Sequence, residues 1–454
     1  MEDKIKLYRE ILHKCFNSDI SFAGNGYEYP PMFLWDKINY KIVQDSWRNA
    51  GLRSRLYYPG LYVHIPFCLS KCNFCEFYSS PIHKLGEIDE YLDFLEKESR
   101  MYSQYLSKVG FRSIYFGGGT PSILNESQLE RIFSSILYKY FSCDKAIQVA
   151  FEASPASLTR NKVRILKKFG VNRLTLGVQS LDDHVIKLSK RVQRRDHVFT
   201  AFEDAKSEGI KCINIDLMAG LPGQTFSSFK NSLDDIMKLK PDLIHVSPFH
   251  PSSPTGFTKK GGIISGLDLE LTNRMLSYSS NFIKKMQIKN GKEYDLPVSN
   301  FYARNIQLID QIQYASTYLG LGAGASSHVF GRVRYVNYMD IKKYFKALSE
   351  GKLAVYRGSK VTIKDEMIYY ATVNLRNPGI NKSLFKKLFN AELATVFNKE
   401  LSYLEEVGII KSIHGYYLPI FKSSLDYLIH SKIFYDKNML SRFSKSKVKK
   451  AATF

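Results

Sequence analysis

The chain has 454 residues, of which 44% are hydrophobic, 14% aromatic and 24% charged, a composition that excludes disordered and collagen-like classes. Its length corresponds to about three typical domains, or to one large barrel with additional segments. The 65 Lys and Arg residues against 43 Asp and Glu residues give a net charge of +22, which favours anionic partners: nucleic acid, a membrane surface, or a small molecule with several carboxylates or phosphates.

The sequence contains no run of the roughly 18 apolar residues that a membrane-spanning helix needs. The first 20 residues also lack the apolar core of a signal peptide, so we expect a cytoplasmic protein without a membrane span. Part of the positive charge lies at the C-terminus, in residues 438–454. We interpret this segment as a basic tail that is too polar to pack, with a nucleic-acid-binding arm as the alternative.

Short runs rich in β-branched and aromatic residues alternate with amphipathic segments, which is the pattern of parallel βα units. Six strands are predicted, at residues 61–65, 113–116, 147–152, 173–178, 212–217 and 243–247. Helices are predicted between them, at residues 88–106, 126–138, 158–169, 196–208 and 225–239. Since eight strands are not visible, the pattern predicts a partial barrel or an open doubly wound sheet. In both, ligands bind at the carboxyl ends of the strands.

Three of the six cysteines follow the first predicted strand within eight residues, at Cys68, Cys72 and Cys75. In a long chain without a secretion signal, this indicates metal or redox chemistry rather than disulfide bonds. A zinc site would ordinarily take its fourth ligand from a second closely spaced pair, which the sequence lacks. Three thiolates suit a [4Fe-4S] cluster, because they hold three corners and leave one iron open. The alternatives are a chance group of buried cysteines and a zinc ion completed by His64.

Other residues able to bind a ligand stand at or after the ends of later strands. They are the loop Gly117-Gly118-Gly119-Thr120, Glu152, Gln179, Arg191 and Asp216. Consecutive glycines let backbone N–H groups approach a ligand closely, and the carboxylates can accept hydrogen bonds from amino or hydroxyl groups. Each has a simpler interpretation as a tight turn or an exposed side chain, but their coincidence at one edge of the sheet favours a site.

The segment from Tyr62 to Cys68, Tyr-Val-His-Ile-Pro-Phe-Cys, with the following Cys72 and Cys75, resembles the radical S-adenosylmethionine (radical SAM) superfamily. In particular, it resembles the branch of the oxygen-independent coproporphyrinogen III oxidases. The resemblance covers residues 61–338 and, more weakly, a small helical wing at 361–435. Further motifs in the family's order are Gly117-Gly118-Gly119-Thr120-Pro121, Phe151-Glu152 with Pro155, Leu176-Gly177-Val178-Gln179-Ser180, Asn214-Ile215-Asp216-Leu217, Gly220-Leu221-Pro222-Gly223-Gln224-Thr225 and Gly320-Leu321-Gly322-Ala323-Gly324.

This resemblance implies an α/β fold with a (β/α)6 partial TIM barrel. It also implies a [4Fe-4S] cluster on Cys68, Cys72 and Cys75, whose open iron binds SAM and whose electron generates a 5′-deoxyadenosyl radical. By position, the residues similar to those around the cluster-bound SAM are Tyr62, Gly118 and Glu152. Those similar to the residues that line a second SAM are Phe74, Gly119, Thr120, Gln179, Arg191 and Asp216. His64, on the same strand as Tyr62, could transfer a proton near the substrate or be a satisfied core histidine.

Departures from the family pattern bear on the substrate. The oxidases carry a further cysteine where this chain has Phe77. The related heme chaperones have an aromatic residue there but also a His-Asn-x-x-Tyr-Trp heme motif, and the sequence contains no His-Asn pair. Nearly 60 residues precede the first strand, as in the oxidase-like methyltransferases and cyclopropanases that the chain resembles.

We therefore predict a radical SAM enzyme that uses two SAM molecules and transfers a methyl or methylene carbon to an unsaturated carbon. The substrate would be a planar, possibly anionic small molecule, and the electron donor a flavodoxin or ferredoxin. Nucleic acid is not an expected partner, and no catalytic side chain is assigned. The alternatives are oxidative decarboxylation of coproporphyrinogen III and a non-enzymatic heme chaperone. The predicted organisation is an N-terminal arm (1–57), a core (58–350), a wing domain (351–437) and the basic tail (438–454).

Overall fold

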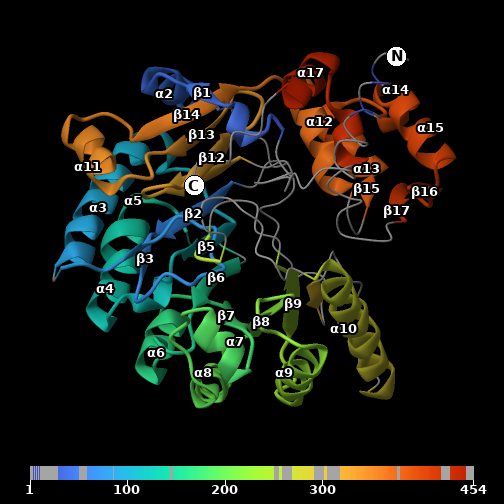
Figure 1. The fold of residues 1–454 in the computed structure, drawn as a ribbon. Coiled ribbons are helices and arrows are strands. Elements are labelled where there is room, and N and C mark those ends of the chain that lie inside the picture. The colour runs from blue at the N-terminus through green and yellow to red at the C-terminus, as the bar shows by residue number, and fades with distance from the viewer. Residues whose placement is uncertain are drawn as a thin grey trace.

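The computed structural model describes residues 4, 6, 8, 10, 29–50, 59–84, 86–143, 146, 148–249, 255–257, 268–290, 301–303, 317–375, 379–420 and 430–445. All six predicted strands are present, and each pairs in parallel with the next (Figure 1). They are β2 (Gly60–Ile65), β5 (Ser113–Gly118), β6 (Gln148–Ala153), β7 (Arg173–Gln179), β8 (Cys212–Ala219) and β9 (Leu243–Pro248). Because both faces of such strands are covered, their apolar runs are nearly continuous.

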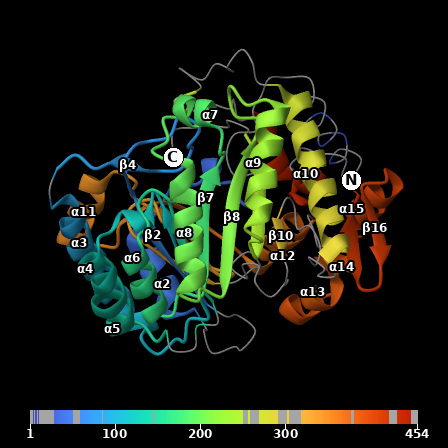
Figure 2. The same cartoon turned by 90° about the horizontal axis from the view of Figure 1, so that it is seen from below.

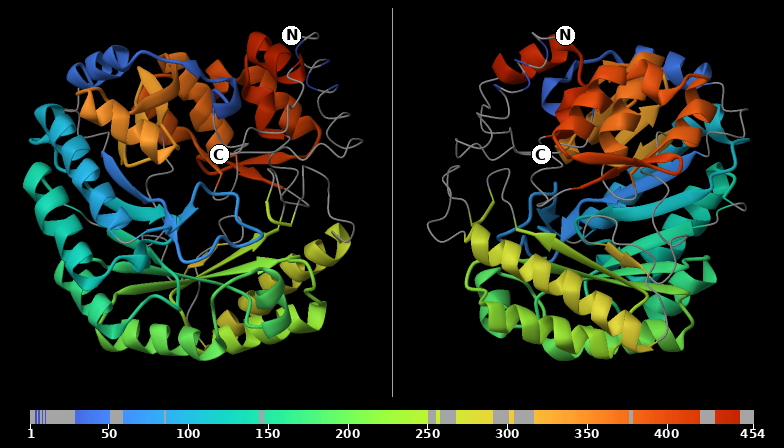
Figure 3. Two further views of the ribbon diagram at one scale, coloured as in Figure 1. Left: turned by 60° about the vertical axis from the view of Figure 1, so that its left-hand side comes forward. Right: turned by 90° about the vertical axis from the view of Figure 1, so that its right-hand side faces the viewer.

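The five predicted helices are also confirmed, and the α/β class with them. They are α3 (Glu87–Leu106), α4 (Glu126–Arg131) continuing to α5 (Tyr138–Tyr140), α6 (Arg160–Lys168), α8 (Arg195–Ser207) and α9 (Phe226–Lys238). Figure 2 shows α8 and α9 lying along β7 and β8. In Figure 3 these helices lie on the outer side of a curved sheet. This differs from the doubly wound alternative, in which helices cover both faces.

The sheet is larger than the sequence predicts: within the described residues it has twelve strands, with β1 and β10 at its edges. On one side, β11 (Tyr318–Leu321) pairs in parallel with β2. The antiparallel strands beyond it are β12 (Ser326–Val329), β13 (Val333–Asn337), β14 (Val355–Lys360) and β1 (Asp36–Lys37). On the other side, β10 (Phe301–Ala303) pairs with β9. Further helices of this part are α2 (Tyr40–Arg48), α7 (Asp183–Leu188), α10 (Leu269–Asn290) and α11 (Ile341–Ser349).

A second hydrophobic core lies in the C-terminal part, at the upper right of Figure 1. Its helices and strands are α12 (Ile363–Asn374), α13 (Lys382–Phe389), α14 (Leu393–Val396), α15 (Asn398–Glu406), β15 (Ile380–Asn381), β16 (Ile410–Ile413) and β17 (Tyr416–Pro419). Tyr29 belongs to this core, where its ring lies 4.9 Å from that of Tyr435 and its hydroxyl donates to Asp436 at 2.5 Å. The chain before β2 therefore contacts both hydrophobic cores. Tyr29 packs in the second core, and β1 pairs with β14, a strand of the large sheet that contributes to the first.

The interpretation of residues 438–454 as a tail too polar to pack is wrong for its first half. The segment begins in helix α17 (Lys437–Lys445), in which Leu440 is fully buried and Met439 nearly so. Met439 and Leu440 pack in the second core and anchor one face of this basic helix, and the basic residues around them had obscured that pattern. Residues 446–454 lie outside the described residues. In the described part of the chain, no helix is long and apolar enough to cross a membrane.

The Gly320–Gly324 motif has a structural role beside the first strand. At Gly322, which has a φ of +103°, a side chain would place its Cβ 2.3 Å from the Tyr91 hydroxyl. The Gly322 amide donates at 2.7 Å to the buried carboxylate of Glu98, which also accepts from Asn337 and Tyr344. Burial raises the pKa of Glu98 to about 7 despite these donors. The motif thus lets α3 approach the strands that carry the site.

Candidate radical SAM site

The cysteines lie on a loop between two short paired strands, β3 (Phe67–Cys68) and β4 (Ser80–Pro81). Hydrogen bonds fix this loop to the turn after α7. The Asn73 amide donates to the Ser189 carbonyl at 2.9 Å, and the Asn73 side chain donates to the Leu188 carbonyl at 2.7 Å. The loop is therefore attached to the segment that leads into Arg191.

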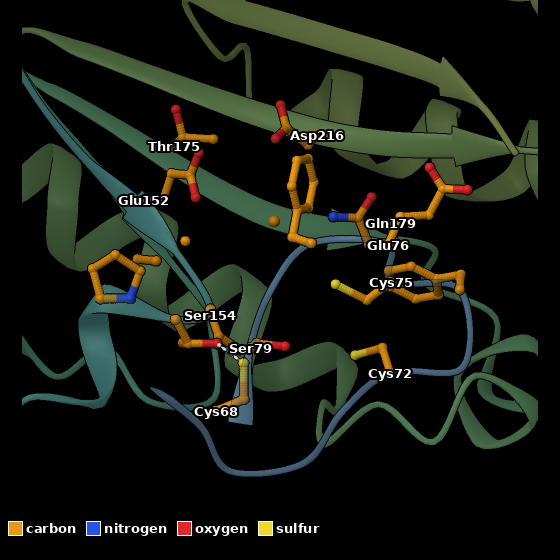
Figure 4. Close-up of a pocket in the computed structure, with 18 of the residues that line it drawn as sticks. Cys68, Cys72, Cys75, Glu76, Ser79, Glu152, Ser154, Thr175, Gln179 and Asp216 are labelled. Carbon is orange, nitrogen blue, oxygen red and sulfur yellow. Dashed lines mark hydrogen bonds between the residues drawn. The ribbon is translucent and has the colours of Figure 1, made fainter. Parts of the chain in front are cut away.

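The three cysteine side chains line one cavity. Figure 4 shows the sulfur atoms of Cys68, Cys72 and Cys75 turned towards a common space. Thr120 donates to the Cys68 sulfur at 3.3 Å, and Arg191 lies 3.7 Å from the Cys72 sulfur. Burial raises the pKa of Cys68, and that of Cys75 to about 11, so ionised thiols here need a positive group such as iron. The described residues contain no group of three side chains set to bind a single metal ion.

Gly119 packs so closely that a side chain would disturb the first cysteine. A Cβ at this position would lie 2.6 Å from the Phe67 carbonyl oxygen and 3.0 Å from the Cys68 sulfur. We expect Gly119→Ala to lower the iron content of the reconstituted protein at least about fivefold, because over-packing forces backbone shifts. Gly170→Ala is the control, since it adds a Cβ at a positive φ where nothing lies within 4 Å. Equal iron contents in the two variants would contradict this prediction.

The residues predicted for the cluster-bound SAM line the same cavity as the cysteines. Glu152, near the end of β6, accepts a hydrogen bond from the Tyr115 hydroxyl at 2.5 Å. Burial raises its pKa to about 7, and the neighbouring charge of Asp216 also raises it. Gly118, with a φ of +115°, lies directly over the His64 ring, which is 2.8 Å from the position of a Cβ. Tyr62 lines the same cavity as Glu152 and Gly118.

His64 has the properties of a satisfied core histidine. It is 6% exposed, and its ring nitrogens lie 2.9 Å from the Tyr62 hydroxyl and 3.2 Å from the Tyr78 carbonyl oxygen. Burial lowers its pKa to about 4, so the ring is neutral at pH 7. Since both nitrogens are engaged, the structure favours this interpretation over proton transfer to a substrate or completion of a zinc site.

The residues predicted for a second SAM come from several elements around the cavity. Phe74 lies on the cluster loop, Gly119 and Thr120 follow β5, Gln179 and Asp216 lie on β7 and β8, and Arg191 follows α7. Gln179 has a φ of +68° at an irregularity in the pairing of the two strands. Arg191 donates to the Gly177 carbonyl and, at 3.0 Å, to Gln193. Asp216 accepts from the Asn214 side chain at 2.8 Å. These contacts orient Arg191 and Asp216, and Arg191 connects this set to the cysteines because it also lies beside Cys72.

One cavity of about 710 Å³ is lined by all twelve residues that the family resemblance assigns to the cluster and to SAM: Tyr62, Cys68, Cys72, Phe74, Cys75, Gly118, Gly119, Thr120, Glu152, Gln179, Arg191 and Asp216. Its volume lies within the range of small-molecule sites, about 300 to 1,000 Å³. In Figure 4, Glu152, Thr175 and Asp216 gather at one end and the cysteines at the other.

The cavity wall includes polar residues that the sequence analysis missed. They are Thr175, Asn214, His245 and Ser247. Asn214 donates to both Thr175 and Asp216, and His245 lies 3.7 Å from the Asp216 carboxylate. Alternate residues of a strand point to the same face. Counting back by four from Gln179 and by two from Asp216 reaches Thr175 and Asn214, so the sequence did contain a signal for them. His250, which the sequence places at the same edge, lies outside the described residues.

Comparisons with known proteins identify the family. The family model described as the Radical SAM superfamily matches residues 62–236. A heme chaperone HemW of Bacillus subtilis is 31% identical over 77% of this chain and 92% of its own length. An oxygen-independent coproporphyrinogen III oxidase of Helicobacter pylori is 30% identical over 77% of this chain and 80% of its own length.

Comparison with solved structures points to the same branch of proteins. The structure of coproporphyrinogen III oxidase (HemN) from Escherichia coli superposes with a TM-score of 0.75 at 23% identity, over 90% of this chain and 96% of that one. The fold is therefore shared along nearly the whole of both chains. The chain belongs to the radical SAM superfamily, in the branch that contains the oxygen-independent coproporphyrinogen III oxidases and the HemW heme chaperones.

Proposed function

We propose that the chain is an enzyme that cleaves SAM at a [4Fe-4S] cluster and uses a second SAM to supply a methyl or methylene carbon. The acceptor would be an unsaturated carbon of a planar small molecule, and the electron would come from a flavodoxin or ferredoxin. One observation carries the proposal: the cysteines and both sets of predicted SAM residues line a single cavity of about 710 Å³.

In this proposal Cys68, Cys72 and Cys75 hold the cluster. When bound, the cluster supplies the electron that cleaves SAM into methionine and a 5′-deoxyadenosyl radical. Glu152 would accept hydrogen bonds from a SAM amino group, and Arg191 would pair with a carboxylate through two parallel hydrogen bonds. The walls of the cavity would keep water from the reactive species.

The raised pKa of Glu152 predicts a pH dependence of SAM binding. With a pKa of about 7, this buried carboxyl is mostly neutral at pH 6 and mostly ionised at pH 7.5. An α-amino group is still largely protonated over that range. The affinity for SAM should therefore rise about threefold or more from pH 6 to pH 7.5, and Glu152→Gln should remove the rise. Calorimetric titration measures both. An unchanged slope in the variant would assign the pH dependence to another group.

Two other functions follow from the names of the relatives. Oxidative decarboxylation of coproporphyrinogen III is favoured by the Helicobacter pylori oxidase, which is similar over four-fifths of its length. The basic surface would also suit the carboxylates of that substrate. A heme-chaperone role is favoured by the Bacillus subtilis relative. It predicts tight heme binding without turnover of SAM.

Product analysis separates the three functions. The protein is reconstituted anaerobically with iron and sulfide, reduced, and given SAM, and the products are followed by mass spectrometry. Both 5′-deoxyadenosine and S-adenosylhomocysteine are expected for the two-SAM transfer. Formation of 5′-deoxyadenosine alone, increased by coproporphyrinogen III, would replace this proposal with decarboxylation. Neither product, together with tight heme binding, would replace it with the chaperone role.

A further inference from the structure

Lys162 is a cation at an unfavourable place in its helix. It is the third residue of α6, which begins at Arg160 and has no acidic residue in its first turn. The N-terminal end of a helix carries a partial positive charge, so the helix itself disfavours a lysine there. Burial also lowers the pKa of Lys162, against the opposing effect of Glu126. A local rule broken in this way indicates that the side chain has a role outside its own helix.

The Lys162 side chain connects two loops. Its amino group donates to the Ser122 carbonyl and to the Ser157 carbonyl, both at 2.8 Å. Ser122 lies in the turn that follows β5, and Ser157 lies in the loop between β6 and α6. Hydrogen bonds from a charged donor are stronger than those between neutral groups. Lys162 therefore joins the segments that follow two neighbouring strands of the sheet.

Three serines join the same two loops. The hydroxyls of Ser122 and Ser157 lie 2.6 Å apart, and the Ser154 amide donates to the Ser122 hydroxyl at 2.9 Å. Ser122 is fully buried, and hydrogen bonds away from water are electrostatically stronger than those in water. We call Lys162 and these three serines the loop junction. Ser154 and Ser157 line the cavity, whereas Lys162 does not.

The loop junction lies next to residues of both predicted SAM sets. Ser122 follows Thr120 by two residues, and Thr120 donates to the Cys68 sulfur at 3.3 Å. Ser154 follows Glu152 by two residues. A displacement of either loop would therefore move a group that is expected to hold SAM. Shifts of about 1 Å in such positions have large effects on an enzyme, even when their cause lies far from the reacting atoms.

We propose that Lys162 is a positioning residue, which joins the loops after β5 and β6 and so sets the spacing of Thr120 and Glu152 for SAM. The inference rests on the proposed function, because it takes these loops to hold SAM. Lys162 acts through the loops and does not itself line the cavity. Its loss therefore weakens SAM binding more than it slows the chemical step.

Amide exchange of the full-length protein before reconstitution tests the loop junction itself. Lys162→Met keeps an unbranched side chain but leaves two carbonyls without their donor. Exchange in residues 118–124 and 152–158 should accelerate at least about tenfold, as measured by mass spectrometry. Lys162→Arg keeps the charge and the donors, and should stay within about threefold of the wild type. Lys168→Met is the matched control on the same helix, because the ion pair of Lys168 with Glu130 is exposed. It should leave exchange in these segments unchanged.

The kinetics of the reconstituted protein test the consequence for SAM. Lys162→Met should raise the KM for SAM about tenfold, while kcat for 5′-deoxyadenosine formation falls less than about threefold and the iron content is unchanged. Lys162→Arg should restore most of the KM.

Three results would overturn the inference: unchanged exchange in Lys162→Met, a lower kcat with the KM unchanged, or equal losses in the Met and Arg variants. Wild-type protein that does not cleave SAM would overturn the proposed function instead. The exchange measurement would then still show separately whether Lys162 joins the two loops.

Discussion

Replacing Cys72 with alanine should lower the iron content of the anaerobically reconstituted protein from about four atoms per chain to less than about one. Formation of 5′-deoxyadenosine should fall below detection, because two cysteines leave two corners of the cluster without protein ligands. Cys72 is partly exposed, and Arg191 lies 3.7 Å from its sulfur. The substitution therefore removes a ligand without opening a large cavity in the core. Iron analysis and mass spectrometry measure the two effects.

Cys143→Ala is the matched control for this variant. Cys143 is also partly exposed, but it does not line the cavity. Its substitution should leave iron content and product formation within about twofold of the wild type. Equal losses of iron and product in both variants would mean that the cluster does not depend specifically on Cys68, Cys72 and Cys75. A normal iron content in Cys72→Ala would mean that Cys72 is not needed to hold its corner of the cluster and would refute the assigned ligand set.

The parallel strands were predictable because each is a long apolar run whose composition differs from its surroundings. The strands added at the edges of the sheet were not predictable. β1 has two residues and β10 three, too few for any periodicity, and their pairing depends on tertiary contacts rather than propensity. The Tyr318–Leu321 strand was noticed only as a glycine motif. Helix α17 was missed because lysines and serines surround its buried Leu440.

The residues of the site could be predicted as a set because they recur at the same edge of successive strands. What the sequence could not supply is how each residue is surrounded. His64 resembles a proton-transfer residue until both of its ring nitrogens are seen to be engaged. Phe77 stood out as a departure from the oxidase pattern, yet its 72% exposure in the cavity is a property of the fold. Exposure and hydrogen bonding depend on neighbours that are distant in sequence.

A buried charged cluster joins the two hydrophobic cores. Glu366 on α12 is fully buried and accepts from the Gly331 amide at 2.9 Å and from Arg334 at 3.0 Å. His328 lies 2.6 Å from the same carboxylate, and the Arg334 guanidinium stacks 3.6 Å from the Tyr369 ring. Burial alone would raise the pKa of Glu366, but the positive charges outweigh it and lower the pKa to about 2. The ionised carboxylate is therefore strongly favoured in the folded protein.

Glu366→Ala should destabilise the junction by about 3 to 5 kcal/mol, because it leaves the buried Arg334 guanidinium without this carboxylate. Amide exchange in α12 should then accelerate at least about a hundredfold, as measured by mass spectrometry. Glu406→Ala, at an exposed position on α15, should change exchange less than about threefold. Equal effects of the two substitutions would show that the cluster contributes little to stability.

The stabilisation by Glu366 should also depend on pH with a definite sign. Its pKa is about 2 in the folded chain against an ordinary value of 4.5. The contribution is therefore fully present above pH 4.5 and is lost as the pH falls towards 2. Glu366→Gln cannot ionise, so the difference in melting temperature between wild type and this variant should be largest at pH 6 and shrink by pH 3. A difference that stayed constant would mean that the carboxylate acts through its shape and hydrogen bonds rather than its charge.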